Sequence, residues 1–265
     1  QNASKNLYWV QVEGEPNKDG YIKGGKWGLA DSQGKVVLQP QYHDILSAPN
    51  GFLTVNIGGK LNNGGNVVGG QWGLVDSLGK VVIQPQYDVI EPTLRSLYLV
   101  QEGGKPNDNG YVVGGQWGLL DSLGKVVIKP QYDNIQIDQK GWYRIQFGGK
   151  LSDEGYLLDG KWGLLDNLGK LVVKPQYDHV QQSSKGLYRV NVGGELNIDD
   201  YIAGGQWGLL DSIGNPIKPL IYNEIAIISN QVIKVKQGDY YSFINIVLPE
   251  MIFSKHDYEG EFSTD

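Results

Sequence analysis

Apolar and polar residues alternate along short segments of the chain, and these segments recur at a constant interval. In one of them, Tyr143, Ile145 and Phe147 alternate with Arg144 and Gln146. An alternation with a period of two predicts a β-strand that turns one face to the core. This first strand of each repeat is predicted at Leu7–Val12, Phe52–Ile57, Leu97–Gln101, Trp142–Phe147 and Leu187–Val192.

A second predicted strand, the Trp strand, carries two glycines and a Trp-Gly pair, as in Val112–Asp121. It follows a connection rich in Gly, Asn and Asp, in which Gly and Asn tolerate the positive φ of tight turns. The paired glycines predict a bulge or a close approach of two backbones. After the Trp strand, Asp-Ser-x-Gly at 76–79, 121–124 and 211–214 predicts a hairpin turn, because Asp is favoured at the first turn position and Gly at the fourth.

A third predicted strand, such as Val81–Ile83, ends at a proline, here Pro85. It is apolar on both faces, which predicts a position between two layers. The Tyr-Asp segment after it predicts a short fourth strand. No window has the 3.6-residue apolar period of a helix with its caps, and 38 glycines in 265 residues disfavour helices. The predicted fold class is therefore all-β.

The unit built from these strands is repeated in tandem. Trp-Gly recurs five times at an interval of 45 residues, and residues 72–88 differ from residues 117–133 at only two of seventeen positions. Such an array buries its apolar faces between neighbouring copies. We therefore expect a single repeat domain over 1–265, with the array at about 7–225, a degenerate capping unit at about 226–253 and a flexible tail at 254–265.

The degenerate unit favours an open architecture. Val232–Lys236, Tyr240–Ile244 and Val247–Phe253 stand for its three strands, and it lacks Trp-Gly. The last unit of an open stack needs a solvated outer face. We therefore favour an open β-solenoid or superhelical array, with a five- or six-bladed β-propeller as the alternative.

The repeated Trp-Gly-Leu-x-Asp-x-x-Gly-Lys, followed by Pro-Gln-Tyr-Asp, resembles the WG (Trp-Gly) β-repeat family of bacterial repeat proteins. The match recurs five times and covers nearly the whole chain. The resemblance implies a β-rich scaffold for binding or interaction and supplies no catalytic residues. The chain departs from the family in the longer connection before the Trp strand, which we interpret as a ligand-facing loop, and in the final unit without the motif.

Composition excludes several classes of function. The net charge is −6, from 23 basic and 29 acidic side chains, and the basic residues are scattered, so no nucleic acid partner is expected. The absence of cysteine excludes disulfides and thiolate chemistry. No apolar run approaches the ~20 residues of a transmembrane segment. Few Lys and Arg with many Tyr, Asn and Gly favour an extracellular or bacterial envelope location.

Most repeated side chains are predicted to be structural. A Trp buries ~150–250 Å², so we assign the repeated aromatic residues to the core, with sugar stacking by Trp as the alternative. The repeated Asp of the hairpin turn caps backbone N–H groups. The core residues are Trp27, Trp72, Trp117, Trp162, Trp207, Tyr42, Tyr87, Tyr132, Tyr177 and Tyr222, and the turn residues are Asp31, Asp76, Asp121, Asp166 and Asp211.

Neither a metal, a cofactor nor an enzyme activity is predicted. Asn17–Gly20 and Asn107–Gly110 resemble the start of a calcium loop, but Asn62–Gly65 carries no carboxylate and no bidentate Glu follows. The three histidines, His43, His179 and His256, are not at equivalent positions. A repeated pair of carboxylates and a nucleophile motif are also missing from the sequence.

One row of polar residues is predicted to bind ligand. If Tyr98 and Val100 face inward, an amide faces outward at every 45-residue step, beside a neighbour that varies strongly, including Arg144 and Arg189. A constant amide beside a variable neighbour is typical of a hydrogen-bonding surface with adjustable specificity. The alternatives are an amide ladder between repeats and a solvated surface. The amides are Gln11, Asn56, Gln101, Gln146 and Asn191.

Two functions follow from this interpretation. The first is a multivalent binding module for glycan or protein ligands, in which several weak sites share one rigid scaffold. The second is a structural protein that associates with itself end to end through exposed strand edges, as fibres or a surface layer.

Overall fold

The computed structural model describes residues 2–4, 7–16, 18, 22–62, 64–93, 97–107, 111–137, 141–152, 157–183, 186–196, 202–229 and 231–247. Contacts divide the chain into two compact units. Unit 1 is 1–135 with 148–158, and unit 2 is 136–147 with 159–265. We predicted one repeat domain; the division falls inside the repeat array, so the same repeat builds both units.

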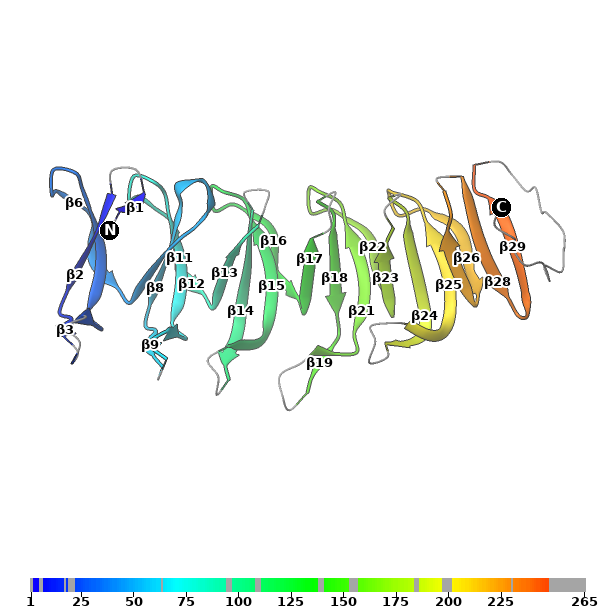
Figure 1. Cartoon of the computed structure of the whole chain (residues 1–265), viewed down its shortest axis with the longest axis horizontal. Helices are drawn as coiled ribbons and strands as arrows, with labels where there is room; N and C mark the ends of the chain where they lie inside the picture. The colour runs from blue at the N-terminus through cyan, green and yellow to red at the C-terminus, as the bar shows by residue number, and fades with distance from the viewer. Residues whose placement is uncertain are drawn as a thin grey trace, which may run out of the picture. The chain divides into compact units, whose positions relative to one another are not determined.

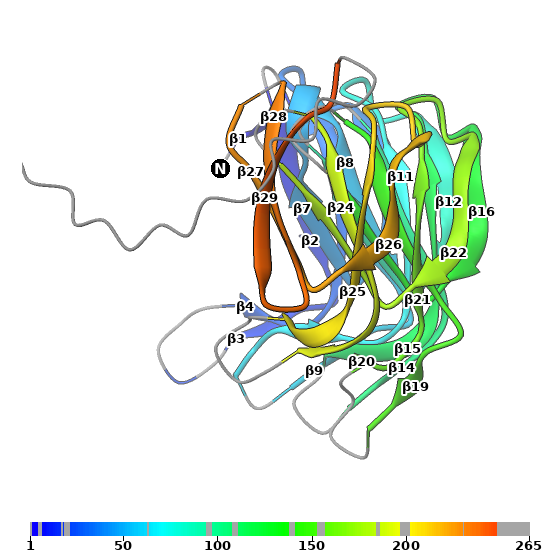
Figure 2. The ribbon, with the colours of Figure 1, turned by 90° about the vertical axis from the view of Figure 1, so that its right-hand side faces the viewer.

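The described part of unit 1 contains three four-stranded antiparallel sheets (Figure 1). Their orders are β1 (Asn2–Ser4), β2 (Leu7–Val12), β5 (Lys26–Asp31), β6 (Val36–Tyr42); β12 (Val81–Tyr87), β11 (Gln71–Val75), β8 (Leu53–Ile57), β7 (Asp44–Ser47); and β13 (Val89–Pro92), β14 (Tyr98–Pro106), β15 (Val112–Leu120), β16 (Val126–Tyr132). Short paired strands complete the unit, namely β3 (Glu15–Pro16) with β4 (Ile22–Lys23), β9 (Lys60–Leu61) with β10 (Val67–Val68), and β19 (Lys150–Leu151) with β20 (Leu157–Leu158). The β3–β4 and β9–β10 hairpins extend from the same end of their sheets (Figure 2).

Unit 2 continues the series. Its sheets have the orders β17 (Asn134–Ile137), β18 (Tyr143–Phe147), β21 (Lys161–Leu165), β22 (Leu171–Tyr177); β23 (His179–Gln182), β24 (Tyr188–Leu196), β25 (Ile202–Leu210), β26 (Pro216–Tyr222); and β27 (Glu224–Ile227), β28 (Val232–Gln237), β29 (Tyr240–Asn245). The division between the units falls within β17. The only helix among the described residues is the 3-10 turn η1 (Pro49–Gly51) of unit 1, so the all-β prediction is confirmed.

The degenerate sixth unit has its first two predicted strands, β28 and β29. The third was expected at Val247–Phe253; Val247 is described as a bend, and 248–253 lie outside the described residues, as does the expected tail at 254–265.

Each main sheet after the first combines strands from two consecutive repeats. The fourth strand predicted after the motif Tyr is present, but it pairs with the first strand of the next repeat, as Ile45 pairs with Val55 and Val180 with Val190. The six main sheets of the described residues share no strands, so they do not close into a barrel. This solenoid-like succession fits the open array, and the choice between that array and the propeller stays a prediction.

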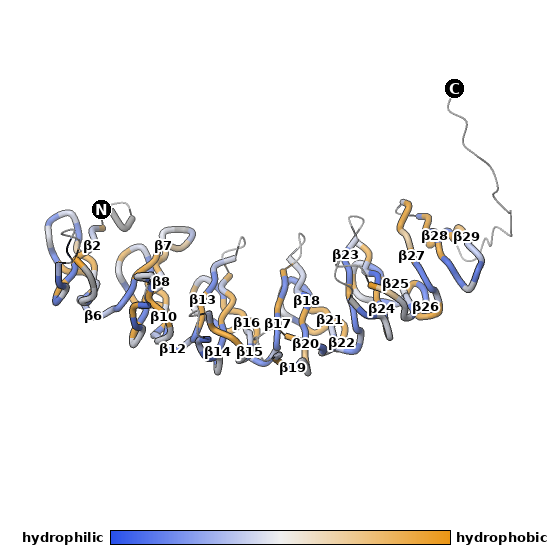
Figure 3. Tube along the Cα trace, turned by 60° about the horizontal axis from the view of Figure 1, so that its bottom comes forward, coloured by the Kyte–Doolittle hydropathy of each residue, from blue (hydrophilic) through white to orange (hydrophobic). Residues whose placement is uncertain are grey.

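The apolar core lies between successive sheets within each unit. In the first cluster, Leu29, Leu38 and Tyr42 of one sheet pack against Ile45 and Val55 of the next. Equivalent clusters join the second sheet to the third and, in unit 2, each sheet to its successor, and Figure 3 shows the apolar segments on these strands. Burying one aliphatic side chain stabilises the fold by about 1.5–3 kcal/mol. A single repeat therefore cannot bury its apolar surface alone.

The Trp strand, and not the third strand, is covered on both faces. Two successive residues in its middle are buried, as Leu74 and Val75 are, and successive residues of a strand point to opposite faces. The third strand lies at the edge of its sheet, and it begins with exposed residues such as Val36 and Val126. The prediction that it lies between two layers is therefore wrong.

A bulge in the third strand accounts for the Trp-Gly motif. Trp117 pairs with Tyr132, and Leu119 pairs with Ile128, so two positions along β15 correspond to four along β16. The extra residues include Pro130, and a Cβ on Gly118 would lie 2.6 Å from both the Ile128 carbonyl oxygen and the Pro130 nitrogen. Only glycine fits beneath this bulge, which explains why glycine follows Trp in the motif.

Gly118→Ala should destabilise the protein by about 1–3 kcal/mol or more, because the methyl group forces the bulge away from the Trp strand. Gly208→Ala is the matched control. In that repeat Leu220 replaces the proline, and the nearest atoms to the added Cβ lie at 3.1 Å and 3.3 Å. Its loss of stability should be smaller, as measured by the midpoint of urea unfolding. Equal losses in the two variants would contradict this account of the motif.

Candidate functional site

The amide row is buried, so the prediction that it faces outward is wrong. Asn56 and Asn191 are 0% exposed, Gln101 is 3% and Gln146 is 8% exposed, while Gln11 of the first sheet is partly exposed. Each amide lies on an inner strand of its sheet, opposite the motif Trp, as Asn56 pairs with Trp72. A ligand in solution therefore has no access to four of the five side chains.

Each amide holds the hairpin of its own repeat. Its nitrogen donates to a backbone carbonyl thirteen residues later, as Asn56 does to Gly69 at 3.0 Å and Gln146 to Asp159 at 2.6 Å. The oxygen of Asn56 also accepts the N–H of Gly59 at 3.0 Å. Because these partners belong to the same repeat, the row is not a ladder between repeats. The other three donors are Gln11 to Gly24, Gln101 to Gly114 and Asn191 to Gly204.

The paired glycines form the close approach that the sequence predicted. Both have positive φ, 71° at Gly24 and 76° at Gly25. A Cβ on Gly25 would lie 2.3 Å from the Val12 carbonyl oxygen, whereas nothing lies within 4 Å of a Cβ on Gly24. The first position therefore accepts a side chain, and Asp159 occupies it in the fourth repeat with φ of 57°.

The two arginines predicted to bind ligand connect neighbouring sheets of unit 2. Arg144 Nη1 donates to the carbonyl of Val180 at 2.8 Å, and its guanidinium lies 5.9 Å from the ring centre of Trp162. Arg189 repeats this arrangement, with a donor distance of 2.9 Å to Ile225 and a ring distance of 5.5 Å to Trp207. Both guanidinium groups thus have partners within the protein. The variable residue near each amide, here an arginine, is the one that lies over the motif Trp.

The repeated aromatic residues lie in or beside the core, and the repeated aspartates lie in the hairpin turns. Trp207 is buried, and Trp27, Trp72 and Trp162 pack half-buried against the core clusters, while Trp117 is half-buried as well. Burial raises the pKa of all five repeated tyrosines. Asp76 Oδ1 accepts the N–H groups of Leu78 and Lys80 at 2.9 Å, and the other four turn aspartates do the same.

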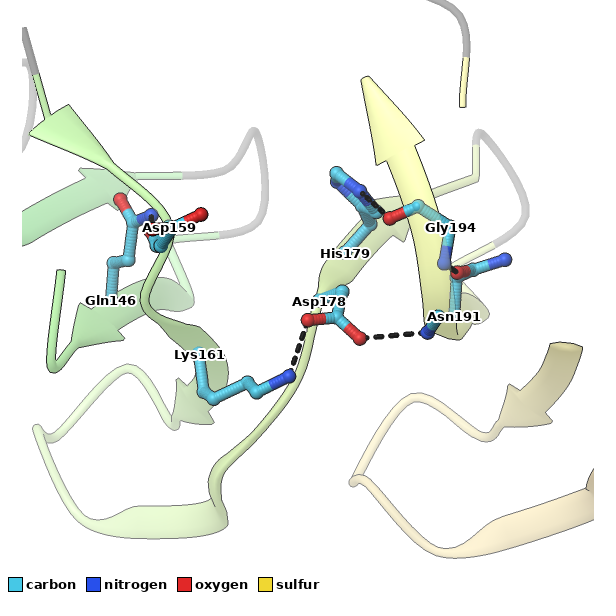
Figure 4. A network of polar contacts seen from close by, with 8 residues as sticks. Gln146, Asp159, Lys161, Asp178, His179, Asn191 and Gly194 are labelled. Atoms are coloured by element: carbon cyan, nitrogen blue, oxygen red, sulfur yellow. Dashed lines mark hydrogen bonds and ion pairs between the residues drawn. The ribbon is translucent and has the colours of Figure 1, made fainter. Parts of the chain in front are cut away.

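Sequence reasoning missed the residue after the motif Tyr, which is Asp in three of five repeats. Asp178 (Figure 4) accepts the N–H of Gly193 at its Oδ2, at 2.8 Å. His43 and Asn223 accept the equivalent N–H, whereas Asp88 and Asp133 accept the N–H of the following glycine. Lys161 forms an ion pair with Asp178. Burial opposes ionisation of Asp178, but the hydrogen bonds from Lys161 and Gly193 and the charge of Lys161 lower its pKa.

His43 occupies this position in the first repeat. Its Nδ1 accepts the N–H of Gly58 at 2.9 Å, and Lys26 Nζ lies 2.5 Å from Nε2. Burial, and then the charge of Lys26, lowers the pKa of His43 below 6.5. Protonation would place a hydrogen on Nδ1 and remove the acceptor for Gly58, so the folded chain favours neutral His43.

A fall in pH should weaken the fold through His43. The unfolded chain takes up the proton at a higher pH than the folded chain, so stability is highest above 6.5 and falls as the pH decreases through the lowered pKa. His43→Asn keeps an acceptor, as Asn223 does for Gly238. The urea midpoint of this variant should change less than that of the original chain between about pH 7.5 and about pH 5.5. The same change in both would contradict the assignment.

Asn56→Ala should destabilise the protein by about 1–3 kcal/mol, because it leaves the Gly59 N–H and the Gly69 carbonyl without their partner. Gln11→Ala removes the equivalent amide at a partly exposed position, so water can replace the lost bond and the cost should be smaller. Chemical unfolding of both variants measures the difference. A cost for Gln11→Ala as large as that for Asn56→Ala would show that burial of the amide does not matter.

A row of aliphatic side chains is exposed at the hairpin turns. Leu78, Leu123, Leu168 and Ile213 are 77%, 80%, 77% and 58% exposed. The turn does not need them, because Gln33 occupies this position in the first repeat and its N–H makes the same 2.9 Å bond to Asp31 that Leu78 makes to Asp76. These four side chains, which we term the turn row, therefore have no visible role in the fold.

An open groove with a volume of about 1540 Å³ lies between the first two sheets of unit 1. Trp9, Gln11 and Trp27 of the first sheet line one side, and Asp44 and Trp72 of the second line the other. Trp9 and Trp27 meet edge to face, with ring centres 6.4 Å apart. The groove is thus aromatic with a few polar groups, a composition typical of binding sites for small molecules.

No three His, Asp or Glu side chains of the described residues gather as metal ligands. In the same part of the chain, no helix has the length and apolar character needed to cross a membrane.

A protein-family model described as "WG containing repeat" matches the sequence at residues 27–60, 72–105, 117–150, 162–195 and 207–241. None of the curated proteins matches the chain. Among solved structures, a eukaryotic initiation factor is 10% identical, over 93% of this chain and 72% of that one, with a TM-score of 0.32. The AfRom2 CNH domain is 9% identical, over 93% and 88%, with a TM-score of 0.26. The tricorn protease is 12% identical, over 83% and 23%, with a TM-score of 0.26.

Proposed function

We propose that this chain, which belongs to the family of proteins with WG-containing repeats, is a non-enzymatic scaffold that binds a protein or glycan partner at several repeated positions. The turn row supports this proposal most strongly. Its aliphatic side chains are repeated every 45 residues, are exposed to solvent and are not required by the turns that carry them. Several weak contacts on one chain add up to high avidity.

The chemistry of the turn row favours a protein partner over a glycan. Aliphatic side chains gain binding energy by removing apolar surface from water, about 1.5–3 kcal/mol for each one that is fully buried. A location at the bacterial envelope or outside the cell, which the composition favours, is part of the proposal.

The second candidate is a structural protein that assembles end to end. Tyr240 and Phe243 are exposed on the last described strand, which favours contact with another copy. On the same sheet, Lys234 and Lys236 lie 4.2 Å and 5.5 Å from the ring centre of Tyr241. Burial of these two charges in a stack would be costly, so we place the binding scaffold first.

The turn row is tested by replacing Leu78, Leu123, Leu168 and Ile213 together with serine and by screening the chain against displayed bacterial envelope and secreted proteins. The fold should persist, because these side chains are exposed. Partners of the original chain should bind the variant at least about tenfold more weakly. The control replaces Val12, Ile57, Phe147 and Val192, which are exposed apolar residues of the first strands, and should bind as before.

Partners that bind the turn-row variant unchanged, or a screen without any partner, would contradict the binding proposal. Filaments that form with increasing concentration, seen by sedimentation and electron microscopy, would favour the structural protein instead.

A further inference from the structure

The groove between the first two sheets lies at the place where, in unit 2, an arginine connects two neighbouring sheets. Arg144 and Arg189 each lie over the motif Trp of their own sheet and donate to a carbonyl of the next, at Val180 and Ile225. The equivalent position in the first repeat is Trp9. Its only donor is one indole N–H, and its ring meets Trp27 edge to face instead.

The carbonyl equivalent to those of Val180 and Ile225 belongs to Ile45, which lines the groove. An arginine at position 9 would therefore extend into the space that is now open. Trp9 leaves this space accessible and adds an aromatic wall to it. Trp9, in the place of this arginine, thus gives the open space an aromatic side.

The walls of the groove suit a sugar ring. Trp9, Trp27 and Trp72 are half-buried and line it, and an indole face packs against the C–H face of a pyranose. Asp44 supplies a carboxylate, of which Oδ1 accepts the N–H of Ile45 at 2.9 Å, leaving the second oxygen for a hydroxyl group. Lys60 provides a donor with the opposite charge. A groove with one group of each sign favours a neutral ligand over a polyanion.

We propose that this groove, walled by Trp9, Trp27 and Trp72, binds a neutral oligosaccharide. A volume of about 1540 Å³ exceeds the 300–1,000 Å³ of ordinary ligand pockets, so it accommodates several sugar units. Asp44 is the only carboxylate among the described lining residues. Hydrolysis of a glycosidic bond commonly requires two carboxyl groups, so the site binds the sugar without cleaving it.

This inference goes beyond the turn row, because it assigns a different ligand to one site that is not repeated. The two proposals can fail separately. Substitutions in the groove leave the turn row intact, and the turn-row variant leaves the groove intact.

The test is a titration of the full chain with cellohexaose, chitohexaose, maltohexaose and laminarihexaose, followed by calorimetry and tryptophan fluorescence. At least one of these sugars should bind with a dissociation constant below about 1 mM and a stoichiometry of one. Trp9→Arg introduces the residue that the fourth and fifth repeats have at this position. It should weaken sugar binding at least about tenfold without loss of stability. Trp9→Phe keeps an aromatic wall and should bind within a few-fold of the original chain.

Asp44→Ala is a second variant, which leaves the tryptophans unchanged. It should also weaken sugar binding. The proposal is overturned if none of the four sugars binds at about 5 mM, if Trp9→Arg or Asp44→Ala binds as tightly as the original chain, or if several equivalent sites are found. A Trp9→Arg variant that does not fold would contradict the inferred arginine contact, and Asp44→Ala would then decide the question of binding.

Discussion

The contact on which this structure depends is the packing of the third-strand bulge against the glycine of Trp-Gly. With no side chain at Gly118, the backbone near Pro130 crosses directly over the Trp strand, and Trp117 then pairs with Tyr132. Beyond this Tyr the chain leaves its sheet, and the fourth strand of the repeat becomes an edge strand of the next sheet. The residue in between, such as Asp88, accepts the N–H of a hairpin glycine in that next sheet. The missing side chain at this glycine therefore positions the Trp–Tyr pair, the segment that crosses to the next sheet, and the residue that accepts the N–H of the hairpin glycine.

This arrangement separates residues that maintain the fold from residues that are free to bind. The amide row and the turn aspartates satisfy backbone groups of their own repeat, and the paired glycines allow two backbones of the same repeat to lie close together. By contrast, the side chain beside the amide differs from repeat to repeat. As Arg189 it connects two sheets, and as Trp9 it borders a groove. The turn row is equally unnecessary to the hairpins that display it. We therefore assign binding to positions whose side chains are not needed to satisfy backbone groups of their own repeat.

The sequence was sufficient to predict the repeat, the strand types, the turn aspartates and the fourth strand, because each depends on local patterns. It was insufficient for the amide row. The alternation of Tyr143 and Ile145 with Gln146 indicated one buried face, yet Gln146 is also buried, since its strand is an inner one and its amide bonds to the hairpin. Phe147, expected inward, is exposed at the start of that hairpin. The alternation of apolar and polar residues does not reveal which backbone group an amide will bond to, or that an arginine will reach the next sheet.

The central claim is that the repeated polar side chains belong to the interior and hold the hairpins in place. Hydrogen exchange of individual backbone amides tests this claim most directly. The N–H groups of Gly59 and Gly194, which donate to Asn56 and Asn191 at 3.0 Å and 2.8 Å, should exchange as slowly as those of the Trp strands. Exchange of these two amides at the rate of an unstructured peptide, with protected Trp strands, would contradict the account.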